Sequence, residues 1–189
     1  MAEVNLEIPK IWKELLKKKE WLGEGDIAGC FCPGFDDGKE WFSNYFGTDD
    51  LALLSRLVYL GQADGTGAAY AILIVDEKKP LEENPVIFID SEAFVLLASS
   101  NLIGLLQLLS IGVDPMGFES DEEIMELTFC PDEEREGFYL DDFREWLESK
   151  GIKPIDLENG EEEGRKIVRQ AMAKYGKELE KFLIDSGYE

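Results

Sequence analysis

The feature that most constrains the fold is a series of four short apolar runs in the middle of the chain. They are rich in β-branched and aromatic residues, as strands are, and they span residues 57–60, 68–75, 86–89 and 94–98. The connections between them, such as GQADGTG and DEKKP, have the composition of turns and are too short to hold a crossover helix. The sequence therefore predicts neighbouring strands in an antiparallel meander.

Segments with helical spacing surround these runs. Asn101 is placed to cap a helix through residues 102–109, which is apolar on nearly every side and is expected to pack against the sheet. Segments with one apolar stripe or a capping signal predict further helices at 8–22, 141–150 and 162–186, and a short one after Asp49 and Asp50. The remaining stretches are expected to be irregular: 23–47, apart from a helical turn at 41–45, and 114–137, apart from an apolar segment at 124–130.

Together these elements predict an α+β fold. Its centre is a mostly antiparallel sheet packed by helices, and its C-terminal segment is helical. A chain of 189 residues suits one compact domain, or one domain with an appendage. We expect residues 1–113 to form the α+β core and residues 114–189 to form an acidic, mostly helical segment that packs on the core or extends it.

The charge of the chain excludes several classes of function. Forty-one Asp and Glu residues stand against 19 Lys and Arg, which gives a formal net charge of −22, and most of this excess lies after residue 113. Nucleic acids and anionic membranes bind basic surfaces, so neither is an expected partner, whereas a basic protein is. The chain contains no histidine, which excludes Ser-His-Asp and Cys-His catalysis and any His-ligated metal.

The cysteines favour a reducing compartment. Cys30, Cys32 and Cys130 cannot all pair within one chain, and they lack the fourth ligand of a structural zinc site. The N-terminus has no apolar core of a signal peptide, and polar residues interrupt the uncharged stretch 93–113, which fits a buried strand and helix better than a membrane span. We therefore expect a cytoplasmic protein without a metal, a cofactor or a membrane contact.

Two loops invite a ligand-binding interpretation. The loop GQADGTG is rich in glycine, but it holds no lysine and precedes a strand rather than a helix, so it predicts a hairpin in which Asp64 bonds its own backbone rather than a phosphate site. Asp36, Asp37 and Asp64 offer oxygen ligands for calcium, yet the alternating acids of an EF-hand loop are absent.

Two further groups of residues are candidates for a functional site. Asp90 and Glu92 flank Ser91 between two predicted strands, where a carboxylate pair would serve a hydrolase and a single carboxylate would bond the strand connection. Trp41 and Tyr45 belong to an aromatic cluster that packs in the core or forms a protein-binding patch.

The order of motifs in residues 57–112 resembles the SUKH superfamily, which includes bacterial immunity proteins and the yeast cell-wall-assembly regulator. The matching features are a glycine-rich hairpin, an apolar strand, an acidic step and a leucine-rich helix: Gly61, Asp64, Gly65 and Gly67; Pro85–Phe88; Ser91 and Glu92; Asn101–Leu109. The helix around Trp146 matches more loosely. The resemblance implies a mostly antiparallel sheet packed by helices, and it brings no catalytic residues.

The resemblance also implies a function. Many SUKH proteins neutralise toxins, often nucleases, by tight binding inside the producing cell, and an acidic binder suits a basic toxin. We therefore expect a non-enzymatic protein that binds a basic partner, with contact residues among Asp64, Asp90, Glu92, Trp41 and Tyr45. The alternatives are a carboxylate-based hydrolase with a cleft beside the sheet and an intracellular regulatory scaffold.

Overall fold

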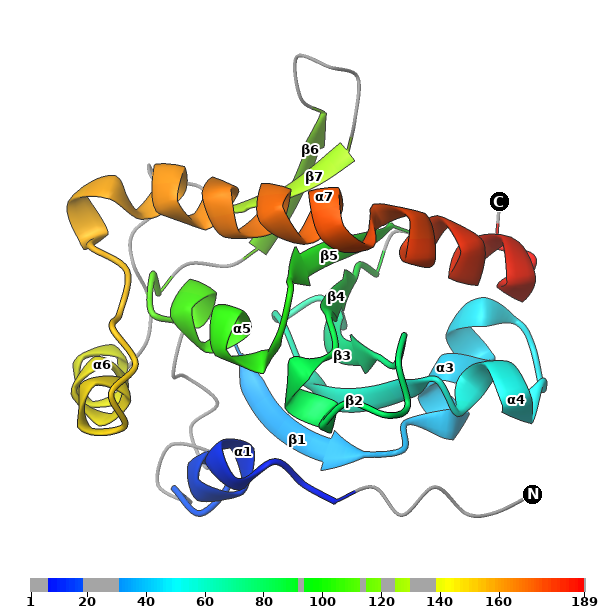
Figure 1. The fold of residues 1–189 in the computed structure, drawn as a ribbon, viewed down its shortest axis with the longest axis horizontal. Helices are drawn as coiled ribbons and strands as arrows, with labels where there is room; N and C mark the ends of the chain where they lie inside the picture. Colours follow the sequence, from blue (N-terminus) through cyan, green and yellow to red (C-terminus); the bar gives the residue numbers. More distant parts are fainter. Residues whose placement is uncertain are drawn as a thin grey trace.

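The computed structural model describes residues 7–18, 31–91, 94–112, 115–119, 125–129 and 139–188. Within these ranges five strands form one antiparallel sheet in which each strand pairs with its neighbour in sequence (Figure 1). The strands are β1 (Cys32–Asp36), β2 (Leu57–Gln62), β3 (Ala69–Leu73), β4 (Val86–Ile89) and β5 (Val95–Ser99). The predicted α+β class and the predicted meander are confirmed.

Helices cover both faces of the sheet, which explains why its strands are nearly continuous apolar runs. Every residue of β3, β4 and β5 is buried. Successive side chains of a strand point to opposite faces, so Tyr70 and Ile72 enter one core and Ala71 and Leu73 enter the other.

The first core lies between the sheet and the helices α1 (Lys10–Leu15), α5 (Leu102–Leu109) and α6 (Leu140–Ser149). As predicted, Asn101 caps α5, since its side-chain oxygen accepts a hydrogen bond of 2.8 Å from the Gly104 amide. Trp12 of α1 is fully buried and its indole nitrogen donates to the Gly34 carbonyl at 2.7 Å, which joins α1 to β1.

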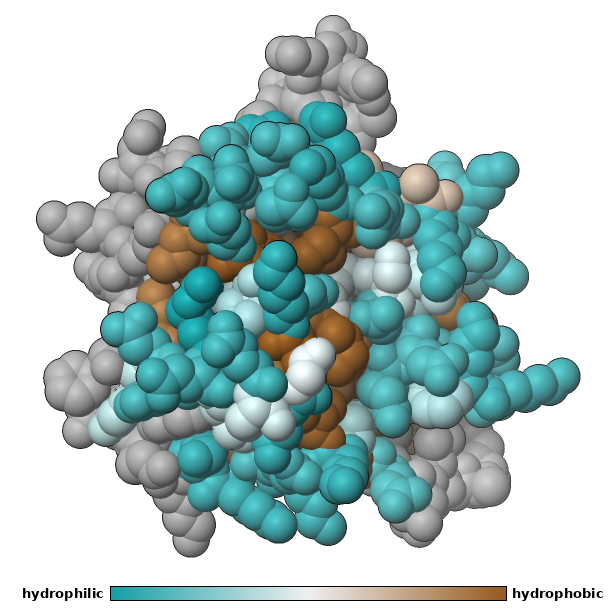
Figure 2. Space-filling view, turned by 60° about the vertical axis from the view of Figure 1, so that its left-hand side comes forward, coloured by the Kyte–Doolittle hydropathy of each residue, from teal (hydrophilic) through white to brown (hydrophobic). Residues whose placement is uncertain are grey.

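Figure 2 shows that hydrophilic side chains dominate the side of the molecule brought forward in that view, with apolar patches between them.

The second core lies between the opposite face and the helices α3 (Lys39–Phe46), α4 (Leu51–Leu54) and the C-terminal half of α7 (Gly160–Ser186). Asp50 caps α4, because its carboxylate accepts from the Ala52 amide at 2.9 Å. The long helix α7 runs past β5, the outer strand of the sheet, so that Val168 joins the first core and Phe182 the second (Figure 1). A helix over the outer strand protects its backbone from pairing with other chains.

Residues 115–119 and 125–129 form a second, two-stranded sheet, β6 (Pro115–Glu119) and β7 (Met125–Phe129). The sequence predicts irregular chain at 114–137 apart from an apolar segment at 124–130, where β7 lies. β6 was missed because Pro115 and Gly117 interrupt it and remove the signal of a β-rich run. Glu126 of β7 fixes this hairpin to α7: its carboxylate lies 3.2 Å from the Arg165 guanidinium and 3.1 Å from that of Arg169.

Residues 31–47, the described part of the segment 23–47, also differ from the expectation of mostly irregular chain. β1 pairs with β2 with a register shift between Pro33 and Asp36, and its burial does not alternate regularly. That irregularity removes the two-residue period by which a strand is recognised. Short 3-10 turns at Leu81–Glu83 and Leu157–Asn159 complete the described elements. Among the described residues, no helix has the length and apolar character needed to cross a bilayer.

Candidate protein-binding surface

Three aromatic rings stack where α3 meets the end of the chain. Trp41 and Tyr45 lie one helical turn apart on α3, and their rings are nearly parallel, at an angle of 8° and a distance of 5.4 Å. Tyr188 follows α7, which ends at Gly187 in a left-handed conformation that turns the chain back. The Tyr188 ring stacks on Tyr45 at 5.7 Å. Local helix geometry and the end of a distant helix therefore build one stack.

The hydroxyl group of Tyr45 ties this stack to the connection between β4 and β5. It lies 2.9 Å from the Tyr188 hydroxyl, and it donates to the Phe94 carbonyl at 3.4 Å. Burial raises the pKa of Tyr45 above its ordinary value, and the hydrogen bond with Tyr188 and the negative charge of Asp90 raise this pKa further. The Phe94 side chain beside it is 41% exposed. We call Trp41, Tyr45, Phe94 and Tyr188 the aromatic surface.

Polar contacts of Thr66 and Ser91 lead from Asp64 to Asp90 across two neighbouring loops. The Asp64 carboxylate accepts from the amide and the hydroxyl of Thr66, both at 2.8 Å, as predicted for a hairpin loop that bonds its own side chain. The Thr66 hydroxyl lies 3.0 Å from that of Ser91, which donates to Asp90 at 3.3 Å. The Asp90 amide donates to the Phe94 carbonyl at 2.8 Å, which also accepts from the Tyr45 hydroxyl, so this row of contacts reaches the aromatic surface. Glu92 lies outside the described residues.

Of the predicted contact residues, Trp41, Tyr45 and Asp90 lie at this one place, and Asp64 reaches it through Thr66 and Ser91. The sequence prediction missed Phe94 and Tyr188. Phe94 begins a predicted strand, and nothing in the chain marks it as the residue that stays exposed. Tyr188 is brought to α3 only by the path of α7.

The calcium interpretation receives no support from these loops. Asp36 accepts a hydrogen bond of 2.6 Å from the Gly38 amide, and Asp37 forms an ion pair of 2.6 Å with Lys39. The hydrogen bond from Lys39 holds the pKa of Asp37 below its ordinary value. In the described part of the chain, no three His, Cys, Asp or Glu residues are arranged to hold a metal. Cys32 is a free, partly exposed thiol, and Cys30 and Cys130 lie outside the described residues.

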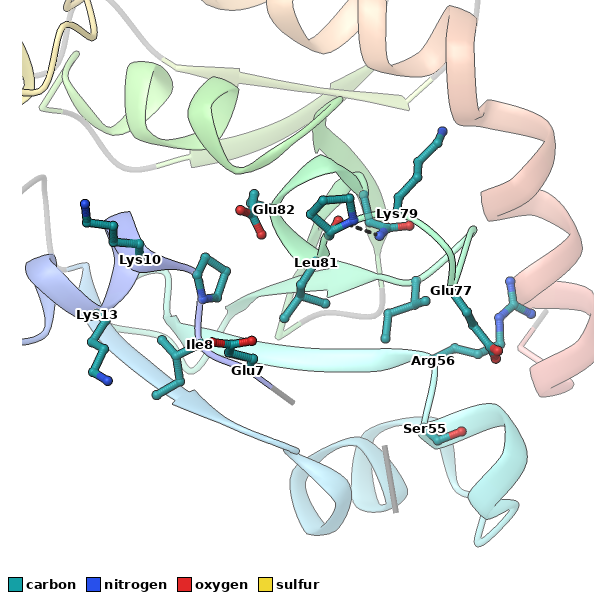
Figure 3. A pocket seen from close by; sticks show the side chains of 14 residues that line it. Glu7, Ile8, Lys10, Lys13, Ser55, Arg56, Glu77, Lys79, Leu81 and Glu82 are labelled. Carbon is teal, nitrogen blue, oxygen red and sulfur yellow. Dashed lines mark hydrogen bonds between the residues drawn. The ribbon is translucent and has the colours of Figure 1, made fainter. Parts of the chain in front are cut away.

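A further cavity lies between α1 and the turn that precedes β4. It measures about 880 Å³ and is lined by residues 7–10, 13, 55, 56, 74, 77, 79–82 and 84. Figure 3 shows the ammonium groups of Lys10 and Lys79 directed away from it. Among the described lining residues Ser55 carries the hydroxyl group, which donates to the Ala52 carbonyl at 2.9 Å.

Comparisons of the chain with family models, with curated proteins and with solved structures find no match. The functional inference therefore rests on the chain's own residues, and among these the aromatic surface is the place where the predicted contact residues come together.

Proposed function

We propose that this chain is a non-enzymatic domain that binds a basic protein, as the resemblance to SUKH immunity proteins implies, and that the aromatic surface makes the central contact. The observation that supports this most is the stack of Trp41, Tyr45 and Tyr188, which is only partly buried and lies beside the exposed Phe94. Tryptophan and tyrosine are enriched among the few residues that dominate binding energy at protein interfaces.

The surface suits a partner that presents lysine or arginine. A cation is attracted to the face of an aromatic ring, and a carboxylate such as that of Asp90 adds to the attraction. The same chemistry already occurs within this chain, where the Arg56 guanidinium lies 5.2 Å from the centre of the Phe182 ring. The proposed partner would supply such a cation to Trp41 or Tyr188.

The net charge of −22 supports the same proposal, because it acts on a partner over longer distances than the contacts of the aromatic surface do. A strongly acidic protein attracts a basic one before contact, which speeds association and selects against acidic partners. This attraction weakens as ionic strength rises, because salt screens charges that are more than about 10 Å apart at 0.1 M. A toxin that acts on nucleic acid would carry the matching basic surface.

The test begins with capture of proteins from cell extract by the immobilised chain at low and at high ionic strength. Each retained protein is then purified and titrated calorimetrically against the wild type, Trp41→Ala and a control, Ile103→Ala. Ile103 is a suitable control because it is an exposed apolar residue on α5, which covers the other face of the sheet. If the retained protein arrests growth when it is expressed alone, co-expression of this chain should restore growth.

We expect Trp41→Ala to weaken binding by about thirtyfold, as the loss of a dominant interface residue does, and Ile103→Ala to change it by less than about twofold. The proposal fails if no basic protein is retained at low ionic strength. It also fails if Trp41→Ala binds the retained protein as tightly as the wild type does.

A further inference from the structure

A narrow crevice opens between β5 and α7, next to the aromatic surface. It measures about 230 Å³. It is lined by Val95, Leu96, Leu97, Glu126, Met172, Gly176, Leu179, Glu180 and Leu183. It borders the aromatic surface at two points, because Phe94 precedes Val95 and the Tyr188 amide donates to the Leu183 carbonyl at 3.1 Å. We call this space the edge crevice.

The walls of the edge crevice are apolar and its rim is acidic. Val95, Leu97 and Leu179 are almost fully buried, so they form the floor. Glu126 is charged, but its side chain is only 5% exposed and it is held by Arg165 and Arg169. Glu180 is exposed at the rim, so it is the carboxylate in the lining that a ligand can reach. The crevice thus offers an apolar space beside an accessible negative charge.

Gly176 widens the crevice without a reason in the chain's own packing. Glycine inside a helix is less favourable than alanine, by about 1 kcal/mol, unless a neighbour needs the space. Gly104 of α5 meets that condition, because a Cβ atom there would lie 2.9 Å from the Ser99 Cβ atom. A Cβ atom at Gly176 would meet nothing within 4 Å. The space at Gly176 is therefore left open on the side that faces the crevice.

From this geometry we propose that the edge crevice receives one apolar side chain of the basic partner, from a segment in which lysine or arginine stands next to leucine, isoleucine, methionine or phenylalanine. This proposal rests on the proposed function and names the anchor of the partner. The crevice is smaller than the roughly 300–1,000 Å³ typical of small-molecule sites, and its size suits a side chain. The cation would pair with Glu180. Strand addition to β5 does not fit, because α7 covers that strand.

The experiment fills the crevice and leaves the rest of the surface unchanged. Gly176→Leu places a side chain in the open space, and Ala173→Leu, at an exposed position of the same helix, is the matched control. A third variant, Glu180→Lys, reverses the charge at the rim without altering the floor. Circular dichroism and the urea midpoint establish that each variant is folded. The probe is a display library of short random peptides, selected against the wild type, and the enriched peptides are titrated against all variants.

We expect the enriched peptides to carry an apolar residue next to a basic one. They should bind Gly176→Leu and Glu180→Lys at least about tenfold more weakly than they bind the wild type. They should bind Ala173→Leu as tightly as they bind the wild type. The proposal is overturned if no peptide is enriched, or if the enriched peptides bind Gly176→Leu as they bind the wild type. If the peptides lose affinity for Trp41→Ala but not for the crevice variants, the proposed role of the edge crevice is wrong and the proposed function still stands. A failure of the proposed function itself would appear as the lack of any retained basic protein.

Discussion

The two faces of the sheet use aromatic residues in different ways. On the face covered by α1, α5 and α6, the central aromatic rings are buried. The ring centres of Trp12 and Phe31 lie 6.1 Å apart, and those of Phe31 and Tyr70 lie 5.8 Å apart. On the face covered by α3, α4 and α7, the ring of the buried Phe42 contacts the ring of the partly exposed Trp41, with 5.4 Å between the ring centres. We call the first face closed, because its central rings are buried, and the second face open, because its stack of Trp41, Tyr45 and Tyr188 is partly exposed.

The closure of the first face has a specific cause. The Arg144 guanidinium donates to the Ser110 carbonyl at 2.6 Å and to the Ile155 carbonyl at 3.0 Å, and the Ser110 hydroxyl accepts from the Ile155 amide at 2.9 Å. These bonds join the end of α5 to α6 and to the chain that precedes α7. On the open face α3 is short and Tyr188 directly follows α7, so the stacked rings lie near the ends of these helices. The comparison predicts that substitutions on the closed face change stability and that those on the open face change binding.

The largest effect is expected from Phe88→Ala on the closed face. Phe88 is fully buried in β4, and removal of a buried ring costs about 3–5 kcal/mol in the free energy of unfolding. Urea denaturation measures this loss, and Ile103→Ala on α5 should change the free energy of unfolding by far less. At a temperature where the variant is folded, its affinity for a retained partner should equal that of the wild type. If Phe88→Ala lost affinity for the partner without losing stability, the distinction between a closed face that sets stability and an open face that sets binding would be wrong.

A smaller loss is expected from Asp64→Ala in the hairpin loop between β2 and β3. Its carboxylate accepts hydrogen bonds from Thr66 and, at 3.2 Å, from the Ala68 amide, and loss of bonds to a charged group costs about 1–3 kcal/mol. Asp64→Asn keeps an oxygen acceptor and should retain most of the stability in urea denaturation. Since Asp64 was predicted as a contact residue, the affinity of Asp64→Asn for a partner reports its charge alone. Equal stability of the two variants would contradict the structural role.

The parts of the fold that depend on local chemistry could be predicted from the sequence. Asn101 and Asp50 cap the helices that they were expected to begin, and the turns between apolar runs produce the meander. β1 and β6 could not be predicted, because proline and glycine occur within both and tertiary pairing rather than a local pattern holds them in the sheets. Strand pairing between distant segments leaves no pattern among residues that are neighbours in the sequence.

The candidate site shows the same division. Trp41 and Tyr45 are four positions apart on one helix, so the sequence already groups them. Tyr188 joins them only because α7 has the length and direction that bring its end to α3. The carboxylates are less predictable, since 41 acids give many plausible pairs. The place of Asp90 between two strands marks it in the sequence, but only the structure brings its loop to Tyr45 through the Phe94 carbonyl.

Two glycine substitutions sharpen the comparison with effects of about 1 kcal/mol. Gly176→Ala on α7 should raise the free energy of unfolding by about that amount, because the added methyl group improves helix propensity and meets open space. Gly104→Ala on α5 should lower it, because the methyl group would lie too close to Ser99. Thermal and urea denaturation of the two variants measure these opposite signs. A stabilised Gly104→Ala would show that the closed face is looser than its contacts indicate.

The smallest effect is expected from the titration of Tyr45 on the open face, because this side chain is partly exposed to solvent. Burial, the Tyr188 hydroxyl and the charge of Asp90 raise its pKa above the ordinary value of 10.0, so the folded protein holds the phenol proton more tightly than the unfolded chain does. The resulting stability is fully present below about pH 10 and is lost as the pH rises through the folded-state pKa. Urea denaturation between neutral and alkaline pH should therefore show a steeper loss above pH 10 for the wild type than for Tyr45→Phe, which keeps the ring and cannot titrate. Parallel curves would mean that Tyr45 is as solvated in the folded protein as in the unfolded chain, and the stack with Tyr188 would then be too open to serve as a preformed binding surface.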